Sequence, residues 1–150
     1  VIGLHVASMY LPSLVTGSLV DKVGRIKMVI ASAVTLTGAG LLAAFAPGDS
    51  TILLTVALML LGLGWNFGLI SGTAIVIDST TIQTRAKTQG SIDVGVAIGG
   101  SLGSMLSSVI VAFSSYAVLG FMGAYLSLLL VPLILWVSIK KRKNIKSMDE

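Results

Sequence analysis

The chain has 150 residues, of which 55% are hydrophobic and 11% are charged, and its mean hydropathy is +0.99. Soluble domains carry about a quarter of their residues as charged side chains, so this composition excludes a water-soluble domain and predicts a membrane protein. Ten Lys and Arg against six Asp and Glu give a net charge of +4, but these charges lie between apolar segments, so we expect no nucleic acid partner.

Five long apolar segments follow one another along the chain. They cover residues 1–20, 28–46, 52–78, 90–113 and 118–139. Each has about 19 to 27 residues, which as a helix crosses a hydrocarbon core about 30 Å thick. Barrel strands are shorter and alternate in polarity, whereas these segments are continuously apolar. The sequence therefore predicts an all-α, polytopic membrane protein, with five transmembrane helices in a single domain (1–150) and a tail at 140–150.

The basic residues of the chain indicate its orientation. Five crossings place the connections at 21–27 and 79–89 and the tail from Lys140 on one side, and these segments contain all ten Lys and Arg. The other side, with the turn Pro47–Ser50, contains none. Short loops rich in Lys and Arg stay in the cytoplasm, so we expect a cell-membrane protein with its N-terminus outside and its C-terminus cytoplasmic. An odd number of helices, the first beginning at once, predicts further helices upstream.

The connection after the first apolar segment carries a specific motif. Its sequence, Gly17-Ser-Leu-Val-Asp-Lys-Val-Gly-Arg-Ile-Lys27, resembles the G-x-L-x-D-x-x-G-R-[RK]-x signature of the major facilitator superfamily. Ile26 departs from the signature, and Lys27 supplies the second basic residue one place later. The chain as a whole is similar to the last five of that family's twelve helices. The resemblance implies a secondary active transporter that moves a small solute by alternating access, with the lipid bilayer, the solute and the missing N-terminal half as partners.

Five residues around this connection are predicted to form a cytoplasmic gate. Gly17 is expected to allow close approach of another backbone, and Gly24 a tight turn. Asp21 ends the first helix, Arg25 begins the second, and Asp78 ends the third on the same side. In the family the matching arginine contacts an acidic residue at the end of the helix two further on, and Asp78 fits that place. The alternative is that Arg25 and Lys27 only anchor the topology.

Trp65 and Asn66 lie close to the middle of the third apolar segment. An amide at that depth needs a hydrogen-bond partner, and an indole offers a stacking surface. The resemblance implies that this helix lines the central cavity, which favours a substrate-binding role for both residues. Because they lie about 100° apart around a helix, both need not face the cavity, and an interhelical hydrogen bond of Asn66 is the alternative.

Two further ionisable residues lie within apolar segments and are candidate charge or coupling sites. Asp93 is about five residues into the fourth segment, where a charged side chain is costly unless it is paired or faces water. Alternatively, the helix begins later and Asp93 is a solvated first-turn residue. His5 near the outer end of the first segment could carry a proton, or could be an ordinary hydrogen-bonded or interfacial histidine.

Glycines recur every four residues in the fourth segment, at Gly95, Gly99 and Gly103. We interpret them as a small-residue face for close helix packing, along which two bundles could also rock. Residues 99–103 spell the hydrolase pattern G-x-S-x-G, but that motif requires a strand-to-helix turn and a base. The chain has no cysteine, and the sequence offers neither a metal-ligand cluster nor a nucleophile with a base. We therefore expect no metal, no cofactor, no catalytic residues and no enzymatic activity.

Two function classes remain. The first is the secondary transporter that the resemblance implies, with the solute site at the interface with the missing half. The second is a non-transporting membrane module, a truncated remnant or accessory subunit that only packs against partners. The identity of the solute, the coupling ion and the direction of transport cannot be derived from these residues.

Overall fold

The computed structural model describes residues 1–146, and within them the chain is helical with no strand. The first apolar segment forms two short helices, α1 (Ile2–Tyr10) and α2 (Ser13–Val23). Four long helices follow, which are α3 (Arg25–Phe45), α4 (Thr51–Ser79), α5 (Ile82–Phe113) and α6 (Tyr116–Lys146). The all-α, polytopic fold class predicted from the sequence is therefore confirmed.

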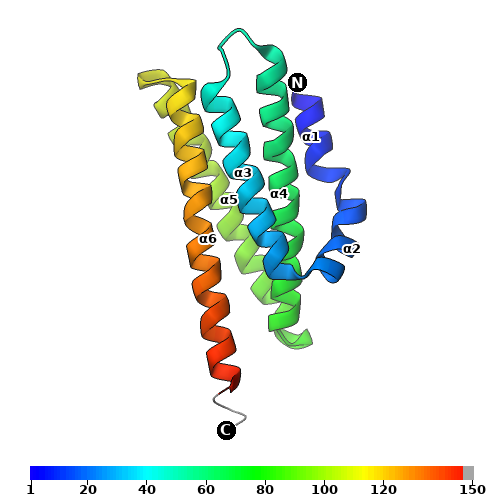
Figure 1. Cartoon of the computed structure of the whole chain (residues 1–150). Coiled ribbons are helices and arrows are strands. Elements are labelled where there is room, and N and C mark those ends of the chain that lie inside the picture. The colour runs from blue at the N-terminus through cyan, green and yellow to red at the C-terminus, as the bar shows by residue number, and fades with distance from the viewer. Residues whose placement is uncertain (147–150) are drawn as a thin grey trace.

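The long helices α3, α4, α5 and α6 each contain a segment long and apolar enough to cross a membrane. The pair α1 and α2, bent by 42°, makes a fifth span if it is counted as one. The N-terminus lies at one end of the bundle and the C-terminal part of α6 at the other (Figure 1). We call the second end, which contains Gly24, Thr80 and Thr81, the basic end, because Lys22, Arg25 and Arg85 lie there.

The bend in the first span has a local cause. The sequence predicted one helix over 1–20, but the helix stops at Tyr10 and a new one starts at Ser13. Pro12 has no N–H to donate to the preceding turn, and its ring clashes with the carbonyl four residues earlier. The Ser13 hydroxyl donates to the Tyr10 carbonyl at 2.5 Å, so one of the carbonyls released by the break finds a partner beside it.

Two other boundaries differ from the sequence prediction. The polar segment 79–89 was expected to be a connection, yet only Thr80 and Thr81 separate α4 from α5, which starts at Ile82. Likewise, α6 continues as a helix to Lys146, although a tail was expected from residue 140. Hydropathy marks where a helix leaves an apolar environment, whereas Lys, Arg and Gln are good helix formers and extend the helix into water.

Helix α3 packs closely on both α4 and α6 and forms the centre of the bundle (Figure 1). On the α6 side, a Cβ built on Gly40 would lie 2.7 Å from the carbonyl oxygen of Gly120. On the α4 side, the Ser32 hydroxyl donates to the Gly64 carbonyl at 2.6 Å. These small residues let the backbones approach closely, which is how helices associate in lipid.

Candidate functional site

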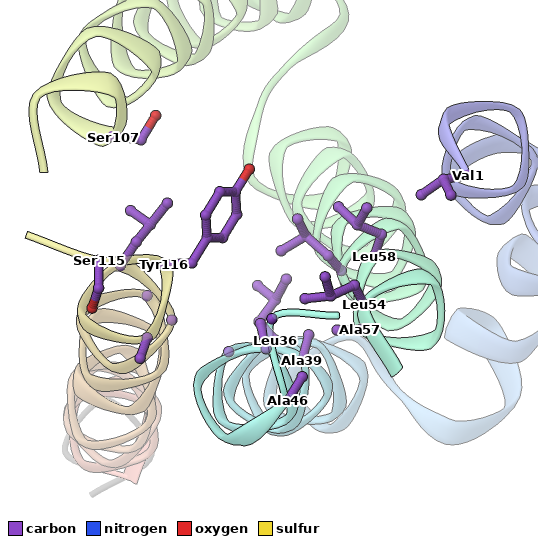
Figure 2. Close-up of a pocket in the computed structure, with 18 of the residues that line it drawn as sticks. Val1, Leu36, Ala39, Ala46, Leu54, Ala57, Leu58, Ser107, Ser115 and Tyr116 are labelled. Carbon is purple, nitrogen blue, oxygen red and sulfur yellow. The ribbon is translucent and has the colours of Figure 1, made fainter. Parts of the chain in front are cut away.

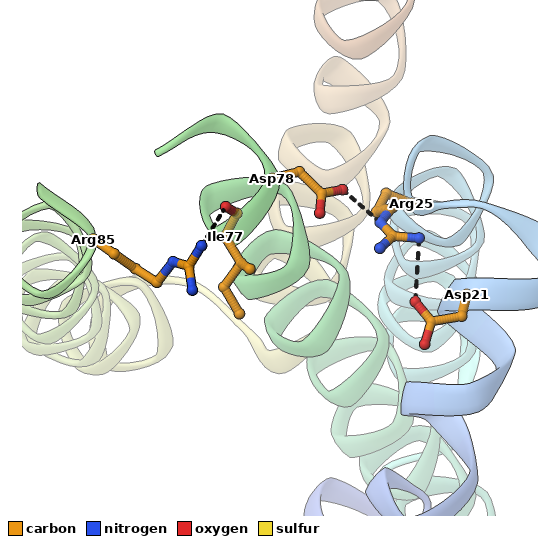
Figure 3. Close-up of polar contacts among 5 residues, drawn as sticks. All are labelled: Asp21, Arg25, Ile77, Asp78 and Arg85. Carbon is orange, nitrogen blue, oxygen red and sulfur yellow. Dashed lines mark hydrogen bonds and ion pairs between the residues drawn. The ribbon is translucent and has the colours of Figure 1, made fainter. Parts of the chain in front are cut away.

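Three charged side chains at the basic end form a network that joins three helices (Figure 3). Arg25 at the start of α3 places Nη1 3.2 Å from Oδ1 of Asp21 on α2 and Nε 2.7 Å from Oδ2 of Asp78 on α4. Gly24 makes this arrangement possible, because it connects α2 directly to α3 with φ of +102°, a conformation that a side chain would strain. The structure thus brings together Asp21, Gly24, Arg25 and Asp78.

Exposure to water weakens the ion pairs of this network. The side chains of Arg25, Asp21 and Asp78 are 33%, 70% and 51% exposed, respectively. Although Arg25 Nε is close to Asp78, its N–H is not aligned for a hydrogen bond to that oxygen. We therefore expect each ion pair to contribute about 1 kcal/mol or less, a strength that allows it to form and break readily.

A second arginine meets the same end of α4 from the other side (Figure 3). Arg85 on α5 donates from Nη2 to the Ile77 carbonyl at 3.3 Å, and the Thr80 hydroxyl donates to the Val76 carbonyl at 2.7 Å. The last carbonyls of a helix lack partners within it and carry its negative dipole end, so both contacts stabilise the end of α4. From the sequence, Arg85 was expected only to help set the orientation in the membrane. The polar residues directly after Asp78 are the sequence signal for a helix end that Arg85 could contact.

Gly17 does not have the packing role expected of it. No other backbone or side chain lies within 4 Å of a Cβ built on Gly17. Instead it lines a groove of about 500 Å³ between α2, α4 and α5, together with Asp21, Thr73, Gln89 and Asp93. The expectation of a close backbone contact at Gly17 is therefore wrong within the described residues, and the residue leaves open space beside α2.

Asp93 lies deeper in its helix than the sequence indicated. It is exposed, and its Oδ1 accepts a hydrogen bond from Gln89 Nε2 at 2.8 Å. Because α5 begins at Ile82, Asp93 is about 17 Å along the helix rather than in its first turn. The first-turn alternative is therefore wrong, and Asp93 presents a carboxylate to the groove beside α2.

Asn66 and Trp65 point to different surroundings. Asn66 is 1% exposed, and its Nδ2 donates to the Met9 carbonyl at 2.8 Å while its Oδ1 accepts from the Thr16 hydroxyl at 2.7 Å. The amide oxygen and nitrogen of Asn66 are therefore both hydrogen-bonded to the first span, which agrees with the alternative of an interhelical hydrogen bond. Trp65 is 41% exposed. Neither residue lines the larger pocket described below.

His5 fixes α1 to α4. Its Nδ1 lies 2.6 Å from the Leu58 carbonyl oxygen. A carbonyl only accepts hydrogen bonds, so Nδ1 carries the proton in this contact. Of the two interpretations of His5, proton carrier or ordinary hydrogen-bonded histidine, the contact agrees with the second. Among the described residues, no cluster of three or more His, Asp or Glu could hold a metal ion.

Comparison with known sequences decides the family. Residues 1–150 match the sequence profile of the Major Facilitator Superfamily. The chain belongs to the major facilitator superfamily. The membership predicted from the motif at Gly17–Lys27 is thereby confirmed, and it points to a transporter rather than an enzyme.

Three curated proteins are similar to this chain. Two come from Bacillus subtilis (strain 168), the uncharacterized MFS-type transporters YdeG and YddS, which are 62% and 60% identical to it over 136 residues, or 91% of this chain. The riboflavin transporter RfnT of Brucella anthropi is 37% identical over 89 residues, or 59% of this chain and 22% of its own length. The matched region is 32% of YdeG and 31% of YddS, so the chain spans about a third of these relatives. No solved structure matches the chain.

A pocket larger than the groove beside α2 lies at the end of the bundle opposite the basic end (Figure 2). It measures about 900 Å³ and lies between α3, α4, α5 and α6, with Leu36, Gly40, Leu54, Tyr116 and Ser107 among its lining residues. The lining is mainly apolar or small and contains no charged side chain. Its position away from Asp21, Arg25 and Asp78 separates it from the ion-pair network.

Helix α5 is the least packed of the four long helices in the described part of the chain. None of its residues is buried, and Gly95, Gly99 and Gly103 have no atom within 4 Å of a built Cβ. The small-residue face expected there therefore has no partner among the described residues. Among the described residues, the glycines at which a built Cβ would come within 3.0 Å of another helix are instead Gly40, Gly62, Gly64, Gly68 and Gly120.

Proposed function

We propose that this chain is part of a secondary active transporter that moves a small solute by alternating access, and that its basic end faces the cytoplasm. Membership of the superfamily and the transporter names of its relatives support the first part of this proposal. The collection of Lys22, Arg25 and Arg85 at one end supports the second, because short basic loops stay in the cytoplasm.

The Asp21–Arg25–Asp78 network is the observation that carries the mechanism. It links the ends of α2, α3 and α4 through two ion pairs at 3.2 and 2.7 Å. Partly exposed pairs of this kind are weak enough to separate when the helices move. We propose that Asp21, Arg25 and Asp78, with Gly24 at the turn and Gly17 beside the groove, form a cytoplasmic gate that stabilises one state of the transport cycle.

Asp93 is the better supported of the two coupling candidates. Its carboxylate is exposed to the groove beside α2, where an ion or proton from the cytoplasm would reach it. We propose that it carries the coupling charge, whereas the contact of His5 with Leu58 supports a role in holding α1. Asp93→Asn is expected to abolish gradient-driven accumulation while solute exchange continues. Equal loss of both activities would contradict a coupling role.

For the solute site we keep Trp65 as a proposed contact, since the residue is 41% exposed and could meet a solute bound against α4. The hydrogen bonds of Asn66 support a structural role in the conformation seen here. A Trp65→Ala variant is expected to raise KM for uptake, whereas Trp65→Phe should retain most of the affinity. An unchanged KM in both variants would remove Trp65 from the site.

Uptake by the full-length protein in proteoliposomes tests the function. A panel of small solutes, with riboflavin included because of the relative RfnT, is offered under an imposed proton or sodium gradient. Accumulation of at least one solute above protein-free liposomes is expected. If no solute accumulates under either gradient although the protein is folded and inserted, the non-transporting module is the better interpretation.

A further inference from the structure

Helix α2 is a short element with an interruption at each end. It has 11 residues, follows the break at Leu11 and Pro12, and ends at Gly24 with φ of +102°. The break turns α2 by 42° away from α1 (Figure 1). Neither junction continues the helical hydrogen-bond pattern through to the next element, so α2 can change direction without unfolding α1 or α3.

Helix α1 is fixed to α4 along one stripe of α4, at positions 58, 62 and 66. His5 Nδ1 lies 2.6 Å from the Leu58 carbonyl oxygen, and Asn66 Nδ2 donates to the Met9 carbonyl at 2.8 Å. Between them, a Cβ on Gly62 would lie 2.7 Å from the His5 carbonyl oxygen. Residues four apart share one face of a helix, so these contacts hold α1 along its length.

Helix α2 has a looser attachment to α4. Thr16 and Val20 are buried, but a groove of about 500 Å³ opens beside Val20 toward Thr73, Ile77 and Asp93. Its hydrogen bond to α4 runs from the Thr16 hydroxyl to Asn66 Oδ1 at 2.7 Å. Space on one side and a single polar attachment in mid-span allow α2 to move while α1 stays in place.

The Thr16 hydroxyl is suited to be released. It lies 2.7 Å from Asn66 Oδ1 and 2.8 Å from the Pro12 carbonyl oxygen, and both atoms are acceptors. A hydroxyl has one proton, so it cannot satisfy both acceptors fully at once. When α2 moves away from α4, the proton remains bonded to Pro12 within α2. Only the acceptor, Asn66 Oδ1, loses its partner on separation, so the cost is lower than for a buried hydrogen bond in which both groups are left unpaired.

We propose that α2 is a hinged half-span that swings about the Leu11–Pro12 break, and that Thr16 and Asn66 are positioning residues that latch it to α4. Asn66 serves both parts of the device, since Nδ2 fixes the end of α1 and Oδ1 holds α2. The inference rests on the proposed function in one respect, which is that the swing opens and closes the cytoplasmic end near Asp21.

Distances between pairs of spin labels in the full-length protein, on a cysteine-free background and without solute, test the hinge. One pair joins Ser18 on α2 to Ile52 on α4, and the reference pair joins Val6 on α1 to Ser79 on α4. All four positions are exposed. We expect two distance populations for the first pair and one for the second. Thr16→Val removes one hydrogen bond and should change the ratio of the two populations about fivefold.

Two variants control for the change at Thr16. Thr16→Ser keeps the hydroxyl and should keep the parent ratio. Thr35→Val is the matched control, because the Thr35 hydroxyl donates only within its own helix, to the Ala31 carbonyl at 2.8 Å. Pro12→Ala restores the missing N–H and should reduce the Ser18–Ile52 distances to one population.

The outcomes separate the hinge from the transport function. A single Ser18–Ile52 distance in the parent and in Thr16→Val, or an equal change in the reference pair, would overturn the hinge, whatever the uptake. Two populations that respond to Thr16→Val support it even if no solute is transported, in which case only the proposed function fails.

Discussion

Among the charged residues of the basic end, Arg25 and Lys27 differ in what they contact. Arg25 joins Asp21 and Asp78, whereas Lys27 is exposed and forms no ion pair in the described part of the chain. The sequence motif treats both as basic positions of one signature. Their environments separate a residue that joins helix ends from one whose charge only favours a topology.

Neutralising the two residues distinguishes a gate from an anchor. We expect Arg25→Gln to release both ion pairs and shift the conformational equilibrium about fivefold, lowering uptake several-fold. Lys27→Gln removes the same charge and should leave uptake near the parent value. Uptake assays with membrane insertion as the control measure both. Equal losses in the two variants would favour the anchor interpretation.

Asn66 shows how a polar residue in a membrane segment acquires its role from its surroundings. We expect Asn66→Leu to leave the Met9 carbonyl without its partner and to lower stability by about 1–2 kcal/mol. Thermal unfolding of the purified full-length protein measures the effect, and Trp65→Leu, which introduces the same side chain at the exposed neighbouring position, is the control. If Asn66→Leu raised KM without loss of stability, a substrate contact would be the better explanation.

At the scale of elements, glycine and alanine spacing decides which helices touch. Gly40 and Ala44 on α3 face Gly120 and Ala124 on α6, where the two backbones nearly meet. Near this contact, the rings of Phe45 on α3 and Phe121 on α6 pack edge to face with their centroids 5.2 Å apart. The glycines of α5, whose regular spacing is the most conspicuous in the sequence, have no neighbour among the described residues.

Adding one methyl group tests this contact. Gly40→Ala would place its Cβ 2.7 Å from the Gly120 carbonyl oxygen, so we expect a loss of about 1–3 kcal/mol. Gly38→Ala on the same helix meets nothing within 4 Å and should be neutral or slightly stabilising. Thermal unfolding in detergent compares them. Similar unfolding temperatures would show that α3 and α6 do not pack as described.

At the scale of the whole molecule, the placement of the turns fixes the sidedness of the bundle. Gly24 and the Thr80–Thr81 break lie at the basic end, and the turn at 46–50 lies at the other (Figure 1). If basic loops remain in the cytoplasm, Gly48 is outside and Thr81 inside. The arrangement therefore makes a prediction for labelling from each side of the membrane.

Single cysteines introduced in the full-length protein test this orientation. Gly48→Cys is expected to react with an impermeant maleimide in intact cells, and Thr81→Cys only after the membrane is made permeable. Both positions are at element ends, so labelling should not disturb the spans. Residues 48 and 81 flank α4, so reaction at both positions from outside would mean that α4 does not cross the membrane and would contradict the five-span topology.

The sequence by itself determined the fold class, the approximate number of spans and the family, because each depends on local composition or on a contiguous motif. Long uncharged segments must be helical in lipid, and the motif at Gly17–Lys27 is read without knowing its neighbours. The sequence also predicted the pairing of Arg25 with Asp78, through the family resemblance. Hydropathy alone did not place the break at Pro12 or the ends of α5 and α6, although the proline and the helix-forming Lys, Arg and Gln are local signals for them.

Only the tertiary structure decided the partners of each polar group. Asn66 bonds to Met9 and Thr16 across separations of 57 and 50 residues, which no local pattern encodes. In the same way, the packing of the helices left Gly17 beside a groove and brought Gly40 against Gly120. The physical reason is common to these cases. A buried polar group or a glycine only creates a need for a partner or an opportunity for contact, and the arrangement of the other helices determines what meets it.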